Sequence, residues 1–333
     1  MNRKSIVMCT LMMSLPVAAD SLHLVDPEYR SAAPSLKIDI NSTEDIKKLS
    51  AGNKPVTQNK GIQITISGRA GNAINLFEFA SENINIKTES LPLIYFIHGG
   101  GYITGSTQDF AETLTELADK HRAKVVGVDY RLATEAPFPA DVNDAYDGLV
   151  YLYHHAKDLH INSEKIIVMG ESAGGGLAAR MLLMLRDTKE VPVSGQILIY
   201  PMLDSRTGTP ASPYNNPFAG EFVWTAKSNQ FGWRMLLGSQ NIPESQRGYF
   251  SPALAQDLKG LPPAFIVTGA LDLFADEDIT YAQRLIHAGV NTELHVLPGL
   301  FHAFEYINPN SHQAVKYKEL RYSAISRMLD SAG

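Results

Sequence analysis

A serine flanked by small residues stands where an apolar stretch gives way to a helical pattern. The run from Gly170 to Gly174, GESAG, has the spacing G-x-S-x-G and follows a predicted strand at 165–169. A tight strand-to-helix turn would push the Ser172 hydroxyl outward, and the two glycines would let strand and helix approach closely. The pattern predicts a nucleophilic serine, and the alternative is a serine that caps a helix in a glycine-rich connector.

Two later residues could activate this serine. A serine hydroxyl is a weak nucleophile near neutral pH, so it needs a base, and the base needs an acid that orients it. For a nucleophile on such a turn, the partners are expected after later strands, first the acid and then the histidine. Asp272 follows a predicted strand at 263–268, and His302 follows one at 292–297. We therefore expect Ser172, Asp272 and His302 to form a catalytic triad.

Other acids and histidines fit these roles less well. Asp276 and Asp278 fall in the expected first turn of a helix, where acidic side chains are favoured in any case. His295 lies inside a predicted strand. Three further histidines end a helix without the spacing of metal ligands: His154, His155 and His160. We predict a solvated surface there and no metal site.

A glycine-rich run follows the third predicted strand, at His98-Gly99-Gly100-Gly101. Attack on an acyl carbon creates an oxyanion, which needs backbone N–H groups positioned to receive it. We expect Gly100, Gly101 and Ala173 to donate to the oxyanion, with His98 and Gly99 supporting the loop. A phosphate cradle is the weaker alternative, because no glycine-lysine pair is present.

The elements that must position these residues begin with a hairpin and continue as strand–helix pairs. Residues 61–67 and 73–80 alternate apolar and polar side chains around a Gly71-Asn72 turn, which predicts the hairpin. The dense apolar run at 91–97 opens an alternation that predicts an α/β protein with a mainly parallel sheet covered on both faces. Further strands are expected at 124–130, 165–169, 193–200, 263–268 and 292–297, and helices at 110–121, 140–155, 174–185, 276–288 and 313–329.

The alternation is interrupted at 202–262. This stretch is rich in Pro, Gly, Ser and Asn, contains both tryptophans, and has helical spacing at 221–237. An insertion of this length in an α/β fold is usually a lid or cap. We expect Phe222, Trp224 and Phe231 to line a pocket for the leaving group of the substrate.

The first nineteen residues have the pattern of a signal peptide. Arg3 and Lys4 precede an apolar stretch at 6–15, and the small residues 17–19 complete a cleavage site before Asp20. The pattern predicts a periplasmic or secreted protein, and the alternative is an uncleaved anchor. The apolar stretch is short for a transmembrane helix, and no later run reaches about 18 apolar residues, so we expect no stable membrane anchor.

Composition excludes several classes of function. The formal charge is −6, and removing residues 1–19 takes away Arg3 and Lys4 and leaves −8 (−6 − 2), the wrong sign for a nucleic-acid-binding protein. Hydrophobic residues make up 44% and charged residues 19%, as in an ordinary globular enzyme. The single cysteine, Cys9, lies in the expected signal peptide, so the mature chain has no thiol nucleophile, disulfide or cysteine metal site.

Taken together, these motifs resemble the hormone-sensitive-lipase-like branch of the α/β hydrolases, which contains many bacterial esterases. The resemblance runs from Leu91 to Phe304. It rests on HGGGY at 98–102, VDYRLA at 128–133 with EAPFP at 135–139, the GESAGG elbow, and the Asp272 and His302 segments. Two residues depart from the family pattern: Thr134 stands where proline is frequent, and Glu171 stands where aspartate is commoner. Because Glu171 adjoins the nucleophile, this departure bears on substrate preference.

The resemblance implies an α/β-hydrolase domain at 61–333, with a helical cap built from residues 20–60 and the insertion 202–262. It also implies hydrolysis of short- to medium-chain acyl esters of small molecules, no cofactor, and a bracing role for residues 129–131. The triad by itself predicts only acyl transfer to water, so an amidase, lactonase or peptidase stays open. A non-catalytic binding protein on the same scaffold is a further alternative, although such proteins typically lose a triad member and all three are present here.

Overall fold

One eight-stranded sheet organises the chain, which the computed structural model describes at residues 20–52, 61–80 and 90–331. The expected signal peptide lies outside the described residues. The strand order is β1-β2-β4-β3-β5-β6-β7-β8, with β2 antiparallel to both β1 and β4 and every pair from β4 to β8 parallel. The strands are β1 Ile62–Ser67, β2 Ala73–Phe79, β3 Leu91–Ile97, β4 Lys124–Asp129, β5 Ile161–Glu171, β6 Gly195–Ile199, β7 Ala264–Gly269 and β8 Thr292–Leu297.

Helices follow the strands in the predicted alternation. The α-helices are α1 Thr43–Gly52, α2 Ala111–His121, α3 Ala140–His154, α4 Ala173–Thr188, α5 Ala226–Leu237, α6 Arg247–Phe250, α7 Ala275–His287, α8 Phe304–Ile307 and α9 His312–Ser331. Short 3₁₀ helices lie at η1 Leu22–Leu24, η2 Ala33–Leu36, η3 Thr107–Phe110, η4 Glu244–Gln246 and η5 Pro252–Leu254. The predicted hairpin is confirmed, since β1 pairs with β2 from Ile62–Glu78 to Ser67–Ala73.

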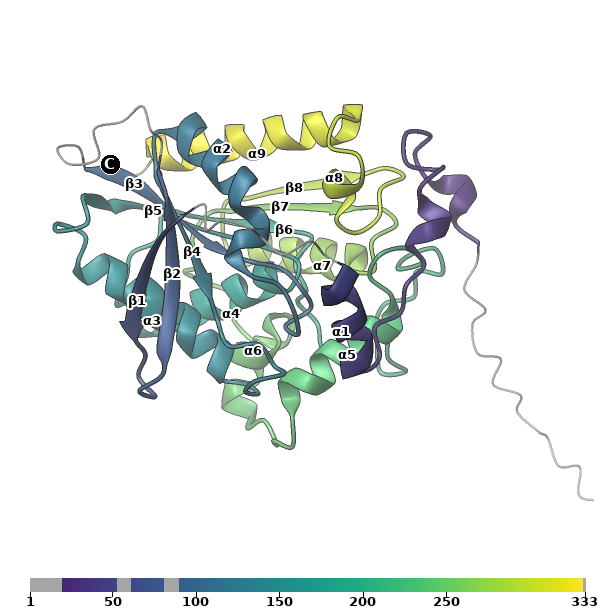
Figure 1. The fold of residues 1–333 in the computed structure, drawn as a ribbon, viewed down its shortest axis with the longest axis horizontal. Helices are drawn as coiled ribbons and strands as arrows, with labels where there is room; N and C mark the ends of the chain where they lie inside the picture. Colours follow the sequence, from purple (N-terminus) through teal and green to yellow (C-terminus); the bar gives the residue numbers. More distant parts are fainter. Residues whose placement is uncertain (1–19, 53–60, 81–89, 332–333) are drawn as a thin grey trace, which may run out of the picture.

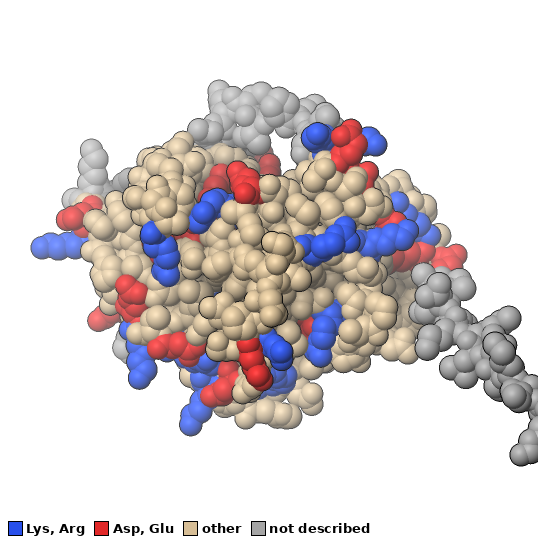
Figure 2. Space-filling view, turned by 90° about the horizontal axis from the view of Figure 1, so that it is seen from below, with Lys and Arg blue, Asp and Glu red and all other residues tan. Residues whose placement is uncertain are grey.

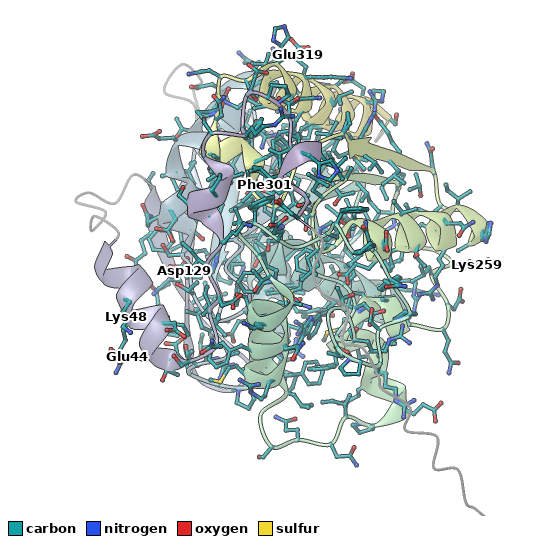
Figure 3. All side chains as sticks on the ribbon, turned by 90° about the vertical axis from the view of Figure 1, so that its right-hand side faces the viewer. Glu44, Lys48, Asp129, Lys259, Phe301 and Glu319 are labelled. Carbon is teal, nitrogen blue, oxygen red and sulfur yellow. The ribbon has the colours of Figure 1, made fainter. Side chains whose placement is uncertain are left out.

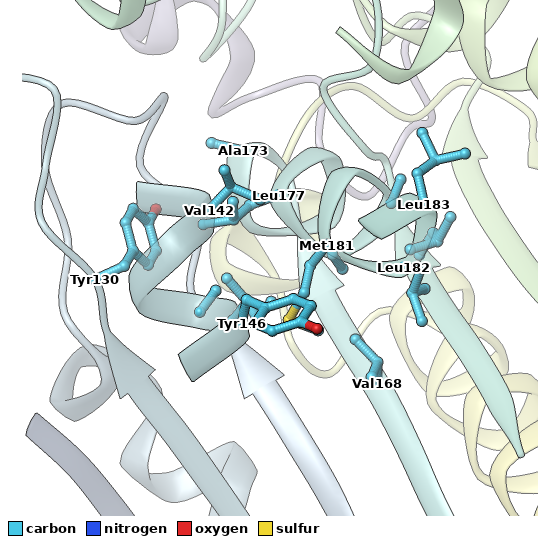
Figure 4. Close-up of a cluster of buried hydrophobic side chains, with 14 of the residues drawn as sticks. Tyr130, Val142, Tyr146, Val168, Ala173, Leu177, Met181, Leu182 and Leu183 are labelled. Carbon is cyan, nitrogen blue, oxygen red and sulfur yellow. The ribbon is translucent and has the colours of Figure 1, made fainter. Parts of the chain in front are cut away.

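The sheet separates two hydrophobic cores. Successive side chains of a strand point to opposite faces, so Tyr95 of β3 belongs to the core that includes residues of α3, α4 and α7, and Phe96 belongs to the core that includes residues of α2 and α9. Figure 1 shows α2 and α9 on one side of the sheet and α3 and α4 on the other. Figure 4 shows the first core around α4, where Leu177 lies beside Val142 and Met181 lies beside Tyr146, both residues of α3. The predicted mainly parallel α/β arrangement, covered on both faces, is confirmed.

The N-terminal segment lies against the insertion between β6 and β7. Figure 1 shows α1 beside α5. Asp39, just before α1, accepts hydrogen bonds from the hydroxyl of Thr225 (2.6 Å) and from the ammonium of Lys227 (2.7 Å). Helix α5 begins later than the spacing at 221–237 suggested, because the Thr225 hydroxyl accepts from the N–H of Ser228 and caps the helix there.

Many charged side chains lie at the surface, whereas large apolar ones fill the interior. In Figure 3, Glu44 and Lys48 of α1 lie at the edge of the molecule, whereas Phe301, which precedes His302, lies inside it. Figure 2 shows acidic and basic side chains interspersed among uncharged ones on the face that it displays. Within the described ranges, no helix has the length and apolar character needed to cross a membrane.

Candidate active site

Ser172 occupies a strained turn between β5 and α4. Its backbone has φ +55° and ψ −122°, a conformation that is unfavourable for a residue with a side chain. Three hydrogen bonds hold the turn: the Ser172 N–H donates to the carbonyl of Ile199 (2.9 Å), and the Ser172 carbonyl accepts from Met202 (2.9 Å) and Gly176 (3.0 Å). The surrounding strands and helix thus enforce a conformation that presents the side chain beyond the end of the strand.

The structure leaves no room for a side chain at either glycine of the motif, Gly170 or Gly174. A Cβ on Gly170 would lie 2.2 Å from the carbonyl oxygen of Gly174, and a Cβ on Gly174 would lie 2.1 Å from the carbonyl oxygen of Ile97. Both distances are far inside van der Waals contact, so any side chain would push α4 away from the sheet. The close approach that the sequence predicted for these glycines is present in the structure.

The structure brings Ser172, His302 and Asp272 into one hydrogen-bonded line. His302 Nε2 lies 2.8 Å from Ser172 Oγ, and His302 Nδ1 lies 2.8 Å from Asp272 Oδ2. All three side chains are buried, Asp272 completely. The other oxygen of Asp272 accepts from the backbone N–H of Phe274 at 2.9 Å, which fixes the plane of the carboxylate. Such a line can move a proton from the serine to the imidazole.

Aromatic rings fix the orientation of His302. The Tyr200 ring meets the imidazole edge-to-face with centroids 4.7 Å apart, and the Phe274 ring does so at 5.3 Å. The histidine stands in the loop after β8, and Tyr200 directly follows β6. Neighbouring parallel strands therefore place the base and its packing partners at the same edge of the sheet as the nucleophile.

The predicted oxyanion loop lies beside the nucleophile. Gly100 has φ +119° and Gly101 has φ +63°, which glycine adopts without strain. The Gly100 carbonyl accepts from Ile103 and Thr104, both at 3.1 Å, so the loop makes a tight turn. Ala173 is the first residue of α4, where N–H groups have no partner within the helix. The structure thus places all three predicted donors next to Ser172.

His98 supports this loop from behind. Its ring stacks on Tyr130 with centroids 4.3 Å apart, and its Nδ1 lies 2.8 Å from the carbonyl oxygen of Gly99. The Tyr130 hydroxyl donates to the His98 carbonyl (3.0 Å), and Asp129 accepts from the N–H of Thr107 (2.7 Å). Burial lowers the pKa of His98, which favours the neutral ring. Tyr130 and Asp129 therefore brace the loops around the site, as the resemblance implied for 129–131.

A cavity of about 340 Å³ opens over the nucleophile. It is lined by Gly99, Gly100, Gly101, Asp109, Phe110, Glu171, Ser172, Tyr200, Val223, Trp224, His302, Ala303 and Tyr306. Trp224 forms one wall so closely that a Cβ on Gly101 would lie 2.1 Å from its ring. Aromatic and apolar side chains dominate the lining, and its two charged side chains are both acidic.

The prediction for the cap aromatics is correct for Trp224 and wrong for Phe222 and Phe231. Neither phenylalanine lines the cavity. Phe222 packs on Phe301 with ring centroids 5.4 Å apart, in the core on the α2–α9 side, and Phe231 is buried in the other core. Val223 has φ +63°, so the backbone at 222–224 is irregular, and the consecutive residues Val223 and Trp224 both line the cavity while Phe222 is in the core.

Three cavity residues that the sequence did not single out are Phe110, Tyr200 and Tyr306. Phe110 ends the 3₁₀ helix after the oxyanion loop, and Tyr306 lies in α8, four residues after His302. The Tyr306 hydroxyl donates to Glu171 at 2.6 Å. The only sequence signal for Tyr306 was its position close to the His302 segment, and the fold is needed to show that it lines the cavity.

Two buried glutamates, Glu171 and Glu305, lie near the predicted triad. Burial raises the pKa of Glu171, which the nearby guanidinium of Arg321 and the Tyr306 hydroxyl partly offset. Burial also raises the pKa of Glu305, with a further contribution from the Glu171 charge, to about 8. The Tyr200 hydroxyl donates to Glu305 at 2.7 Å.

The competing acids and histidines lie outside the triad. Asp276 and Asp278 fall in the first turn of α7, as predicted. His295 lies in β8, with Nε2 2.6 Å from Glu293. In the part of the chain that the structure describes, no group of three His, Cys, Asp or Glu side chains is arranged to hold a metal ion.

The chain has the features of the α/β-hydrolase class. Its eight-stranded sheet is mainly parallel, a serine stands on the turn between β5 and α4, an acid follows β7, and a histidine follows β8. Residues 94–306 match the family model described as alpha/beta hydrolase fold, and the chain belongs to that family. The fold and the family predicted from the sequence are both confirmed.

Several of the similar proteins are named esterases. An arylesterase of Saccharolobus solfataricus is 32% identical over 219 residues, covering 66% of this chain and 70% of the relative. The structure titled bacterial heroin esterase superimposes with a TM-score of 0.79 at 32% identity, covering 93% of this chain and 99% of that chain. An esterase of Pyrobaculum calidifontis gives 0.78 at 28% identity, covering 93% and 100%.

These matches differ in extent. The chain spans 63%, 70% and 65% of the length of the first three curated relatives that it matches, and nearly all of the similar solved structures. The predicted enzyme class, a carboxylic ester hydrolase, is confirmed at the level of the family. The triad roles, the oxyanion donors and the substrate size remain predictions.

Proposed function

We propose that this protein hydrolyses carboxylic esters of short- to medium-chain acids by way of an acyl-enzyme on Ser172. The observation that carries the proposal is the hydrogen-bonded line from Ser172 through His302 to Asp272, with both contacts at 2.8 Å, opening into a cavity. The names of the relatives support ester rather than amide as the substrate class.

The chemistry follows from the positions of these atoms. His302 Nε2 takes the proton of Ser172 Oγ as the oxygen attacks the acyl carbon, and Asp272 stabilises the imidazolium that forms. The tetrahedral intermediate collapses when His302 returns this proton to the leaving alcohol. Water then attacks the acyl-enzyme with His302 again as base, and the acid departs as Ser172 recovers its proton.

Charge on the intermediate is met by backbone N–H groups. In this proposal Gly100, Gly101 and Ala173 donate to the oxyanion, and the N-terminus of α4 adds the favourable end of its dipole. Gly101 packs closely against Trp224, since a Cβ there would lie 2.1 Å from the tryptophan ring, so the ring limits movement of the loop on that side.

Cavity size and lining support a small, uncharged or cationic substrate. A volume of about 340 Å³ is near the lower end for small-molecule sites and suits a short or medium acyl group with a modest alcohol. The lining is aromatic and apolar, and its charged members, Asp109 and Glu171, are both carboxylates. A negatively charged acyl chain would be repelled at this wall.

The decisive experiment is hydrolysis of p-nitrophenyl acetate, butyrate, hexanoate and octanoate by the chain beginning at Asp20, together with Ser172→Ala. We expect turnover of the shorter esters and its loss in the alanine variant, with matched anilides cleaved far more slowly. His295→Ala serves as a control, because this histidine lies in β8 and pairs with Glu293. Wild-type turnover by Ser172→Ala would disprove the mechanism, and failure of an organophosphate to label Ser172 would favour a binding protein.

We also propose that residues 1–19 direct the protein to the periplasm or medium, and that residues 20–60 with 202–262 form a cap. The contacts of Asp39 with α5 and its capping residue Thr225 support the second point. Fractionation of cells producing chains with and without residues 1–19 tests the first. Recovery of both forms in the cytoplasm would contradict it.

A further inference from the structure

Glu171 and Tyr306 join two walls of the cavity. Glu171 is the last residue of β5 and directly precedes the nucleophile, and Tyr306 lies in α8. The Tyr306 hydroxyl donates to Glu171 Oε2 at 2.6 Å, across 135 residues of sequence. The Tyr306 ring meets the Phe110 ring edge-to-face with centroids 5.9 Å apart, and all three residues line the cavity.

The carboxylate of this pair is fixed on the side of the protein core. Glu171 is 1% exposed and pairs in register with Ile199 of β6, so its backbone cannot shift along the strand. Its Oε1 lies 3.9 Å from Arg321 Nη1, a guanidinium that is itself buried. A hydrogen bond to a buried carboxylate is strong, and losing it would leave desolvated charge less compensated. The Tyr306 hydroxyl is therefore held firmly.

The aromatic end of the pair is less constrained. Tyr306 is 45% exposed, so its ring is open to solvent on one side and rests on Phe110 on another. Without its hydroxyl bond to Glu171, this ring could rotate outward and widen the cavity. We propose that Glu171 positions Tyr306 and that the pair determines how bulky a substrate group the cavity accepts. This inference rests on the proposed ester hydrolysis and adds a specificity determinant to it.

Side-chain length is the critical property of residue 171. Aspartate is one methylene shorter, about 1.5 Å, and a contact of 2.6 Å cannot bridge that loss while the strand stays in register. Glutamine keeps the reach and can still accept from Tyr306, but it carries no charge. The variants Glu171→Asp and Glu171→Gln therefore separate reach from charge, which matters because Glu171 also lies close enough to His302 to interact with its charge.

The test measures two selectivity ratios of kcat/KM: p-nitrophenyl pivalate over acetate for acyl bulk, and 1-naphthyl acetate over phenyl acetate for alcohol bulk. A ratio within one enzyme does not depend on the fraction that is folded. We expect Glu171→Asp and Tyr306→Phe each to raise at least one ratio about fivefold or more. The double variant should exceed neither single variant, because both remove the same contact.

Two controls accompany these variants. Glu171→Gln should keep both ratios within about twofold of the wild type, because its reach is unchanged. Tyr146→Phe removes a tyrosine hydroxyl that bonds Glu190, and since neither residue lines the cavity, it should leave the ratios unchanged.

Several results would overturn the proposal: ratios that do not move, single effects that multiply in the double variant, or Glu171→Gln acting like Glu171→Asp. A wild-type enzyme that cleaves none of these esters would instead contradict the proposed function. The two failures are thus distinguishable in one set of assays.

Discussion

Replacing Asp272 with asparagine should abolish catalysis through the tautomer of His302. Asp272 Oδ1 accepts from the backbone N–H of Phe274, and Oδ2 faces His302 Nδ1. In Asp272→Asn only one position can be the amide oxygen. The Phe274 N–H requires an acceptor, because a buried unpaired donor costs about 1–3 kcal/mol. The oxygen therefore stays there, and the NH₂ group turns to His302.

The consequence is the wrong protonation of the imidazole. An NH₂ group needs an acceptor, so His302 must present its lone pair at Nδ1 and carry its proton on Nε2. A protonated Nε2 donates to Ser172 Oγ and cannot take its proton. The loss expected from this exchange is about 10⁴-fold in kcat, which corresponds to about 5 kcal/mol of transition-state stabilisation. Because size and packing are conserved, the thermal midpoint should change little.

The assay is kcat on p-nitrophenyl butyrate, with burst titration of active sites to exclude wild-type contamination. A small contaminating fraction would otherwise mimic residual activity. Retention of more than about a tenth of wild-type kcat by well-folded Asp272→Asn would refute the tautomer argument. It would also indicate that another acid orients His302.

Three further predictions concern the loop, pH and the buried ion pair. Gly101→Ala places a Cβ 2.1 Å from Trp224 at φ +63°, and we expect kcat/KM to fall about 10²-fold or more, with partial recovery in Gly101→Ala/Trp224→Ala. Burial raises the pKa of Glu305 to about 8 from an ordinary 4.5, so unfolding releases a proton between these values and stability falls as pH rises from about 5 to 8. In Glu305→Gln, the free energy of unfolding, measured in urea, should fall less steeply with pH in this window than in the wild type, by up to about 1.4 kcal/mol per pH unit. An equal pH dependence in the two proteins would contradict the raised pKa of Glu305. Arg180 and Asp141 form a doubly hydrogen-bonded pair, both side chains almost fully buried, so Asp141→Ala should cost about 3–5 kcal/mol in urea unfolding, whereas Arg180→Met/Asp141→Leu should cost less.

The fold was largely predictable because its signals are local. The apolar runs of the parallel strands, the small residues at Gly170 and Gly174, and the acids that start α7 are each readable within about ten residues of sequence. Boundaries were less accurate. Strand β5 runs Ile161–Glu171, whereas the apolar pattern indicated 165–169, because pairing with both β3 and β6 extends the strand beyond its apolar centre.

The convergence of the three candidate catalytic residues was predictable for a related reason. In a parallel sheet the loops after successive strands meet at one edge, so a serine, an acid and a histidine placed after β5, β7 and β8 must converge. The cavity wall was not predictable in the same way. Phe222 and Phe231 are aromatic, as pocket residues often are, yet both are buried in the cores. The irregular backbone around Phe222 has no periodic sequence pattern from which the direction of its side chain could be predicted, and the direction of Phe231 depends on how α5 is rotated.

At position 171 the sequence predicts an effect on substrate preference, but the structure is needed to explain it. Its departure from aspartate indicated an effect on substrate preference but not a cause. The cause needs a partner, and Tyr306 lies 135 residues away in a four-residue helix that no apolar pattern predicts. Since catalytic groups are set by strand order and pocket walls by single long-range contacts, substitutions such as Glu171→Asp should alter which ester is cleaved while leaving the line through Ser172, His302 and Asp272 in place.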